Sequence, residues 1–132
     1  MSNLTSNIPL IILRLEADFQ AFATDGKWYI RETDPEPAKS AIIGMIGNAM
    51  GLKRLDPKLL QLEQNLEIAI RIDREGTIIE DYHTIQAGSR SANRKFSVNP
   101  LLTTRTYLQN ASFLVILKSK KNDKKVLEEI AE

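Results

Sequence analysis

The chain of 132 residues contains no cysteine, a single histidine and no long hydrophobic run. Without thiols it can form neither a disulfide nor a thiolate zinc site, and it has no cysteine nucleophile. Its longest apolar runs, Ile8–Leu13 and Ala111–Leu117, are far shorter than the roughly 20 residues that cross a bilayer core. The N-terminal residues do not show the pattern of a signal peptide, which is a basic segment followed by a long apolar stretch. These absences predict a cytoplasmic protein with no signal peptide and no membrane partner.

Motifs for metals and nucleotides are also missing from the sequence. The acidic residues Asp73, Glu75, Glu80 and Asp81 do not have the spacing of a calcium loop. No glycine lies just before Lys39-Ser40, as a phosphate-binding P-loop would require. We therefore expect neither a metal ion nor a cofactor.

Acidic residues are absent from one long segment. Residues 82–122 contain seven Lys and Arg and no Asp or Glu, whereas the rest of the chain holds eleven Lys and Arg and all 17 acidic residues. This asymmetry indicates either a polyanionic partner that contacts the basic segment or a solvated basic loop without a partner. Charge alone leaves both interpretations open.

The hydrophobic pattern predicts a single domain over residues 1–132. A strand at 8–15, central in its sheet, is followed by a loop at 16–33 and by a helix at 38–50 that Gly51 ends. Gly44 and Gly47 lie inside this helix, where each costs about 1 kcal/mol relative to Ala. We expect a close contact, most simply core packing, to offset that cost.

The second half of the chain predicts more strands than helices. Asp56-Pro57 indicates the start of a short helix. Alternating apolar residues predict a strand at 66–73 that forms a hairpin with 77–82. A loop rich in Gly, Ser, Asn and Arg at 84–100 then leads to strands at 102–108 and 112–118, joined by a Gln109-Asn110 turn, and to a helix at 126–131.

This order of elements predicts an α+β fold, a ferredoxin-like or RRM-like antiparallel sheet with helices on one face. A complete sheet of this type has one more strand after its second helix, and none is predicted after residue 131. We therefore expect either a truncated chain or a partner that supplies the missing strand.

Several stretches of the sequence, taken in order, resemble a known family. They are Leu13-Arg14-Leu15-Glu16, the segment from Arg31 to Gly47, Ile70 to Gly76 with Asp81-Tyr82-His83-Thr84, and Arg105 to Phe113. Their order and spacing resemble the N-terminal domain of the type I-E members of the fifth family of CRISPR-associated proteins, in the RAMP superfamily. The resemblance extends over nearly the whole chain.

The resemblance implies a non-catalytic, RNA-binding subunit of Cascade, the antiviral surveillance complex. Such a subunit holds the 5′ handle of the CRISPR RNA and contacts other Cascade subunits, above all the backbone subunit. The basic loop at 84–100 corresponds to the family's thumb. Members continue past the second helix with a further strand, so the resemblance also implies C-terminal truncation. An uncovered sheet edge invites pairing, and we expect self-association through it.

The start of the helix at 38–50 carries three candidates for RNA contact. Lys39 offers a charge and Ser40 a donor beside free backbone N–H groups, which suit a phosphate. Arg31 lies nearby in the sequence and is a possible helper. The alternative is a simple helix cap with a solvated lysine.

The acid-free segment carries five more candidates. Its loop residues are suited to neutralising phosphates and, through one aromatic ring, to stacking on a base or inserting into a partner. A strand arginine farther along can face RNA or pair with an acid such as Glu67. These candidates are Arg90, Arg94, Lys95, Phe96 and Arg105.

Tyr82 and His83 are the candidates for catalysis, because some relatives cleave RNA without a metal through Tyr, His and Lys. As a general base His83 would need a second acid and a scissile phosphate within reach. The sequence indicates no such partner, and we expect a structural role and no enzymatic activity. A metal-independent RNA endonuclease and a protein-interaction module of the complex are the alternative functions.

Overall fold

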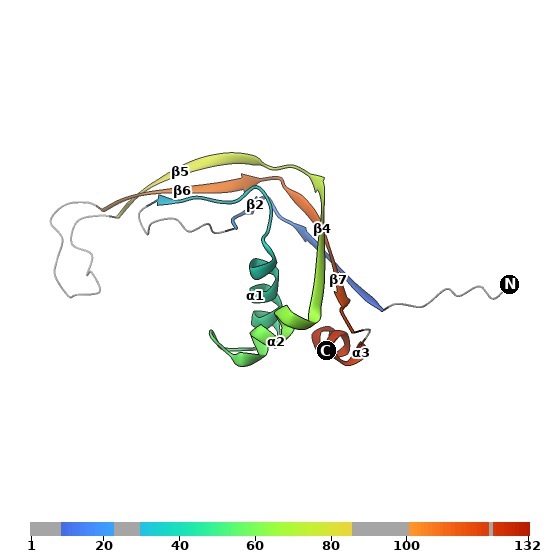
Figure 1. The fold of residues 1–132 in the computed structure, drawn as a ribbon. Helices are drawn as coiled ribbons and strands as arrows, with labels where there is room; N and C mark the ends of the chain where they lie inside the picture. The colour runs from blue at the N-terminus through green and yellow to red at the C-terminus, as the bar shows by residue number, and fades with distance from the viewer. Residues whose placement is uncertain (1–8, 23–29, 86–100, 122) are drawn as a thin grey trace, which may run out of the picture. The chain divides into compact units, whose positions relative to one another are not determined.

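The computed structural model describes residues 9–22, 30–85, 101–121 and 123–132 (Figure 1). The chain divides into two compact units. The first is formed by the segment up to Glu16 with Pro37–Asp73 and Ser112–Glu132, and the second by Ala17–Glu36 with Arg74–Ala111. No helix among the described residues is long and apolar enough to cross a membrane.

The first unit contains a three-stranded sheet and three helices. Its strands β1 (Leu10–Glu16), β4 (Leu66–Arg74) and β7 (Ser112–Ser119) lie in the order β1-β7-β4, and β1 is antiparallel to β7. Its helices are α1 (Lys39–Ala49), α2 (Pro57–Asn65) and α3 (Lys124–Ala131). The chain thus runs strand, helices, strand, strand, helix, as the predicted α+β ferredoxin-like fold requires.

All three helices cover the same face of this sheet, and alternation along the strands determines which residues they bury. Every second residue of β7 is buried from Phe113 to Leu117. The buried cluster combines the helix residues Ile42, Ile43, Ile46, Leu62 and Leu127 with the strand residues Leu66, Val115 and Leu117.

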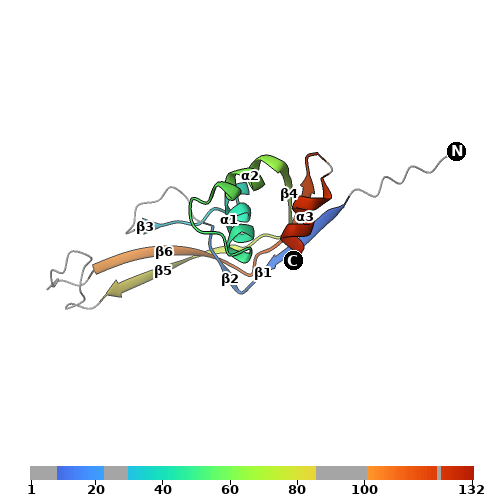
Figure 2. The same ribbon diagram turned by 90° about the horizontal axis from the view of Figure 1, so that it is seen from below.

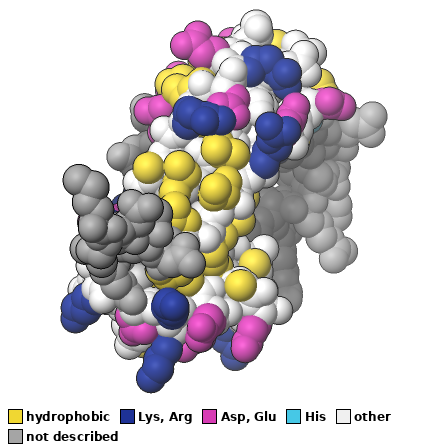
Figure 3. All heavy atoms as spheres, turned by 90° about the vertical axis from the view of Figure 1, so that its right-hand side faces the viewer, with side chains coloured by type: hydrophobic (Ala, Val, Ile, Leu, Met, Phe, Trp, Pro, Cys, Tyr) yellow, Lys and Arg dark blue, Asp and Glu magenta, His cyan; other side chains and the backbone are white. Residues whose placement is uncertain are grey.

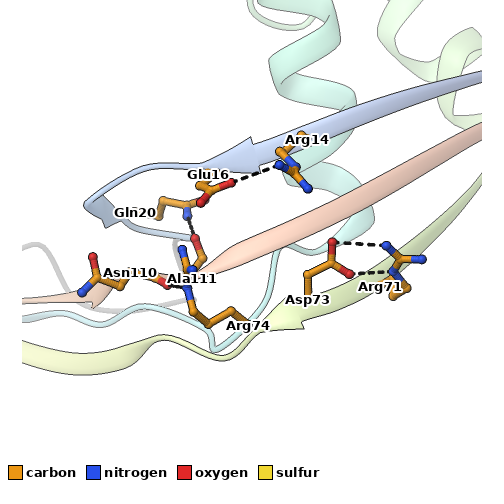
Figure 4. A network of polar contacts seen from close by, with 8 residues as sticks. All are labelled: Arg14, Glu16, Gln20, Arg71, Asp73, Arg74, Asn110 and Ala111. Atoms are coloured by element: carbon orange, nitrogen blue, oxygen red, sulfur yellow. Dashed lines mark hydrogen bonds and ion pairs between the residues drawn. The ribbon is translucent and has the colours of Figure 1, made fainter.

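The opposite face of the sheet has an apolar centre. Leu10 and Ile12 of β1 remain 49% and 59% exposed on it. Figure 3 shows a band of hydrophobic side chains that is bordered at both ends by lysines, arginines and acidic residues. On β4 the ion pair between Arg71 and Asp73 has an Nε–Oδ1 distance of 2.6 Å (Figure 4).

The predicted helix signals are confirmed. The Asp56 carboxylate accepts a hydrogen bond from the Lys58 amide at 2.9 Å, with Pro57 in the first helical position. Gly51 follows α1 with φ of 72°, the conformation that glycine adopts without strain. The contact expected at the helix glycines exists at Gly47, where an added Cβ would lie 2.3 Å from Leu59 Cδ2, whereas Gly44 meets nothing within 4 Å.

The second unit is built around β6 (Leu101–Gln109). Along one edge β6 pairs with β5 (Thr77–Ile85) over its full length, in antiparallel register from Thr77 opposite Gln109 to Ile85 opposite Leu101. Two short strands share the other edge: β2 (Phe19–Gln20) is antiparallel to β6 and β3 (Ile30–Arg31) is parallel to it. Figure 2 shows β5, β6 and β3 running side by side.

The turn after β6 is held by backbone and side-chain hydrogen bonds within the second unit. Asn110 adopts φ of 59°, which Asn tolerates better than most residues. Its amide donates to the Asp18 carbonyl oxygen at 3.0 Å, and its own carbonyl oxygen accepts from Arg74 Nε at 2.6 Å. Gln20 Nε2 donates to the Ala111 carbonyl oxygen at 2.8 Å (Figure 4).

Three predictions about the strands are wrong. The strand at 66–73 does not form a hairpin with 77–82, because β4 pairs with β7 while β5 pairs with β6. The first strand is not central but lies at the edge of its sheet. The segment 16–33 contains β2 and β3 as well as loop, because β6 offers a free edge that two-residue strands can join. Strand pairing between distant segments is invisible to local periodicity.

Candidate nucleic-acid interface

One face of the second sheet brings together side chains from three strands. Residues directly opposite each other in a register lie on the same face. Arg105 of β6 faces Asp81 of β5 on one side and Arg31 of β3 on the other. Two arginines that the sequence suggested separately are therefore neighbours in a single row across the sheet.

Arg105 is the central residue of this row, and its hydrogen bonding is incomplete. Its Nε is buried and has no acceptor among the residues that the structure describes. The facing carboxylate of Asp81 is engaged by His83, with Nε2 2.5 Å from Oδ2. A buried guanidinium donor without an acceptor is costly. An oxygen from outside these residues, such as a phosphate oxygen, would remove this cost and form a charge-assisted hydrogen bond.

The next row of the same face is aromatic. Tyr107 lies two residues from Arg105 on β6 and faces Ile79 of β5. Phe19 of β2 is 57% exposed and lines the same cavity as Tyr107 and Ile79. Sequence reasoning missed Phe19 and Tyr107, and only their aromatic character next to a basic segment could have signalled them.

The structure separates the two residues that the endonuclease alternative needs. Tyr82 and His83 are consecutive in β5, so their side chains point to opposite faces of the sheet. Tyr82 faces Thr104, while His83 lies beside Asp81 on the arginine face. They cannot approach one phosphate together. Among the described residues no three His, Asp or Glu side chains are grouped to hold a metal ion.

The start of α1 is held by hydrogen bonds within the first unit. Lys39 Nζ donates to the carbonyl oxygens of Glu63 at 2.9 Å and Leu66 at 3.1 Å. It thereby satisfies carbonyl groups at the C-terminal end of α2 and its junction with β4. Ser40 is exposed, and no side chain caps the helix at Ala38. The ammonium of Lys39 therefore supports the fold of the first unit.

Four predicted RNA contacts and one predicted ion pair remain. Arg90, Arg94, Lys95 and Phe96 lie outside the described residues, between β5 and β6. The suggested pairing of Arg105 with Glu67 is wrong, because Glu67 lies 3.6 Å from Lys118 Nζ instead.

Comparison with known proteins identifies the family. The model of the CRISPR-associated protein family (Cas_Cas5) matches residues 10–132. The chain belongs to this family. It is 31% identical over 116 residues to the CRISPR system Cascade subunit CasD of Escherichia coli K12, a match that covers 81% of this chain and 52% of that protein.

Solved structures agree with this family membership. A chain of a CRISPR RNA-guided surveillance complex matches with a TM-score of 0.77 and 28% identity, covering 93% of this chain and 54% of that one. A Cas protein crystal structure matches with a TM-score of 0.62 at 24% identity, covering 92% of this chain and 49% of its own, and shows the shared fold. The chain thus spans about half the length of the relatives it matches.

Proposed function

We propose that this Cas_Cas5 family chain is a non-catalytic RNA-binding subunit of a Cascade-type surveillance complex in the cytoplasm. Its ligand would be the 5′ handle of the CRISPR RNA, and its protein partners the other Cascade subunits, above all the backbone subunit. The observation that carries the proposal is the row formed by Arg31 and Arg105. The Nε of Arg105 is buried and has no acceptor among the described residues. The family match and the likeness to CasD support the same function.

The proposal is tested by titrating a labelled single-stranded repeat handle with the whole chain at several salt concentrations. Each phosphate contact contributes roughly 0.7 to the slope of log affinity against log salt concentration for single strands. We expect Arg105→Gln and Arg31→Gln each to weaken binding and to reduce this slope by about 0.7. Arg54→Gln is the matched control, because Arg54 is exposed on the first unit.

The same titration separates the alternatives. If Arg54→Gln changes the slope as much as Arg105→Gln does, the arginine row is not the RNA site. Loss of binding after neutralising Arg90, Arg94 and Lys95 together would add the segment at 84–100 to the interface. Metal-free cleavage of the RNA that disappears in His83→Ala would favour the endonuclease. Capture of the backbone subunit without any RNA binding would favour a protein-interaction module.

For the first unit we propose pairing with a second copy of the chain along β1. Among the described residues β1 pairs only with β7, so its other edge is uncovered. Beside it lies a groove of about 390 Å³ whose apolar lining includes Leu13, Met45 and Ile130. A strand added antiparallel to β1 would place alternate side chains in this groove. The opposite edge strand, β4, is less suited because it carries the Arg71–Asp73 ion pair.

A further inference from the structure

The arginine row lies next to a cavity on the same face of the second sheet. The cavity has a volume of about 410 Å³ and is lined by Phe19, Ile79, Glu80, Asp81 and Tyr107. Asp81 belongs both to this lining and to the row with Arg105. Asp81 therefore lies between the aromatic cavity and the two arginines, Arg31 and Arg105.

The spacing of the two rows fits one nucleotide. Tyr107 and Arg105 are two residues apart on β6, which places their Cα atoms about 7 Å apart along an extended strand. This separation lets a base occupy the cavity while the phosphate of the same nucleotide reaches the guanidinium groups. The volume is ample for a base, and Phe19, which is 57% exposed, can stack on it.

One polar side chain in the lining can select among bases. The carboxylate of Asp81 can only accept hydrogen bonds when ionised, whereas the side chain of Glu80, the preceding residue of β5, points to the opposite face. His83 holds Oδ2 of Asp81, and Oδ1 has no partner among the described residues. An accepting oxygen matches the amino group of adenine, cytosine or guanine. Uracil has no amino group, and its one donor on this edge, N3–H, lies between two carbonyl oxygens that a carboxylate repels.

We propose that this face is a subsite for one nucleotide with an amino-bearing base. The base stacks between Phe19 and Tyr107, its amino group donates to Asp81 Oδ1, and its phosphate binds Arg31 and Arg105. His83 positions the carboxylate. The inference rests on the RNA binding proposed above and adds base discrimination at a defined place.

The test compares labelled decamers of adenylate, cytidylate and uridylate as probes for the whole chain at fixed salt. We expect adenylate and cytidylate to bind about 5- to 20-fold more tightly than uridylate. Asp81→Asn should bring these affinities within about twofold of one another, because an amide can both donate and accept. Phe19→Ala should weaken binding to all three decamers by about 5- to 20-fold.

Tyr82→Ala provides the matched control. Tyr82 is an aromatic residue of β5 that is 61% exposed, but it lies on the opposite face. It should leave all three affinities unchanged, and circular dichroism should show that every variant is folded.

The outcomes distinguish the subsite from the general function. Salt-dependent binding of all decamers without discrimination, or equal losses in Phe19→Ala and Tyr82→Ala, would overturn the subsite and leave the RNA-binding function standing. Absence of binding to every decamer and to the repeat handle at low salt would overturn both.

Discussion

At the scale of single residues, one exposed ion pair makes the first unit sensitive to acid. The hydrogen bond from Arg71 holds the pKa of Asp73 below its usual range, and the charges of Arg71 and Arg14 act in the same direction, whereas desolvation opposes them. Because this pKa is lower in the folded state than in the unfolded state, the folded chain binds fewer protons in acid. The stabilisation is therefore complete above the usual aspartate pKa of about 4 and is lost as the pH falls through the lowered value.

Replacing Asp73 should flatten this acid dependence. We expect Asp73→Asn to lower the free energy of unfolding at neutral pH and to lose less of it than the wild type between about pH 5 and pH 2. Urea unfolding at pH 6, 4 and 3 measures the difference. Glu36→Gln is the control, because Glu36 is exposed and makes no ion pair among the described residues. Parallel pH profiles for wild type and Asp73→Asn would contradict the expectation.

The residue scale also shows where a role followed from the sequence and where it did not. The Asp56 cap and the Gly51 stop were predictable, because each acts on backbone groups a few residues away. The role of Lys39 was not, because its two carbonyl acceptors belong to residues more than twenty positions later in the chain.

At the scale of elements, α1 and α2 are in contact through a glycine. Gly47 leaves room for the Leu59 side chain, whose Cδ2 would lie 2.3 Å from an added Cβ. Gly44, one turn earlier, has open space around its Cα. The sequence suggested the same role for both glycines, and the structure distinguishes them.

Alanine substitutions at the two glycines should therefore differ in their effect on stability. Gly44→Ala is expected to raise the free energy of unfolding by about 0.5–1 kcal/mol, because the helix gains propensity at no steric cost. In Gly47→Ala the same gain is offset by displacement of Leu59, so the stability should equal or fall below that of the wild type. Thermal and urea unfolding measure both variants. Equal stabilisation by the two substitutions would show that Leu59 does not need the space.

At this scale the prediction and the structure differ most in which strands pair with each other. The alternation in residues 66–73 predicted that Leu66, Ile68, Ile70 and Ile72 share one face of a strand. The first three pack in the core of the first unit, whereas Ile72 is 42% exposed. The alternation could not reveal that β5 pairs with β6, because strand pairing depends on segments that are far apart in the chain.

At the scale of the whole molecule, the uncovered edge of β1 should determine the oligomeric state. We expect the chain to form dimers whose population rises with concentration, since Ile12 is 59% exposed on that strand. Ile12→Lys should shift the equilibrium to monomer, because it places a charge beside the proposed interface. Sedimentation velocity over a range of concentrations measures the shift.

Leu55→Lys serves as the control for this experiment. Leu55 is 89% exposed and belongs to no strand, so its replacement removes apolar surface without touching an edge. A monomeric wild type at all concentrations would overturn the proposed self-association. Dissociation by Leu55→Lys as well as by Ile12→Lys would move the contact away from β1.

The sequence by itself determined the features that depend on near neighbours and on composition. These are the α+β class, the helix starts and stops, the buried side of the strand at 66–73, and the resemblance that the family match confirms. Caps, turns and periodicity act over a few residues, and a family pattern is carried by linear order.

Only the tertiary structure decided which strands pair and therefore which side chains meet. Arg31 and Arg105 become neighbours because β3 joins β6 in parallel. Tyr82 and His83 point to opposite faces because both lie in β5 and adjacent side chains alternate along a strand.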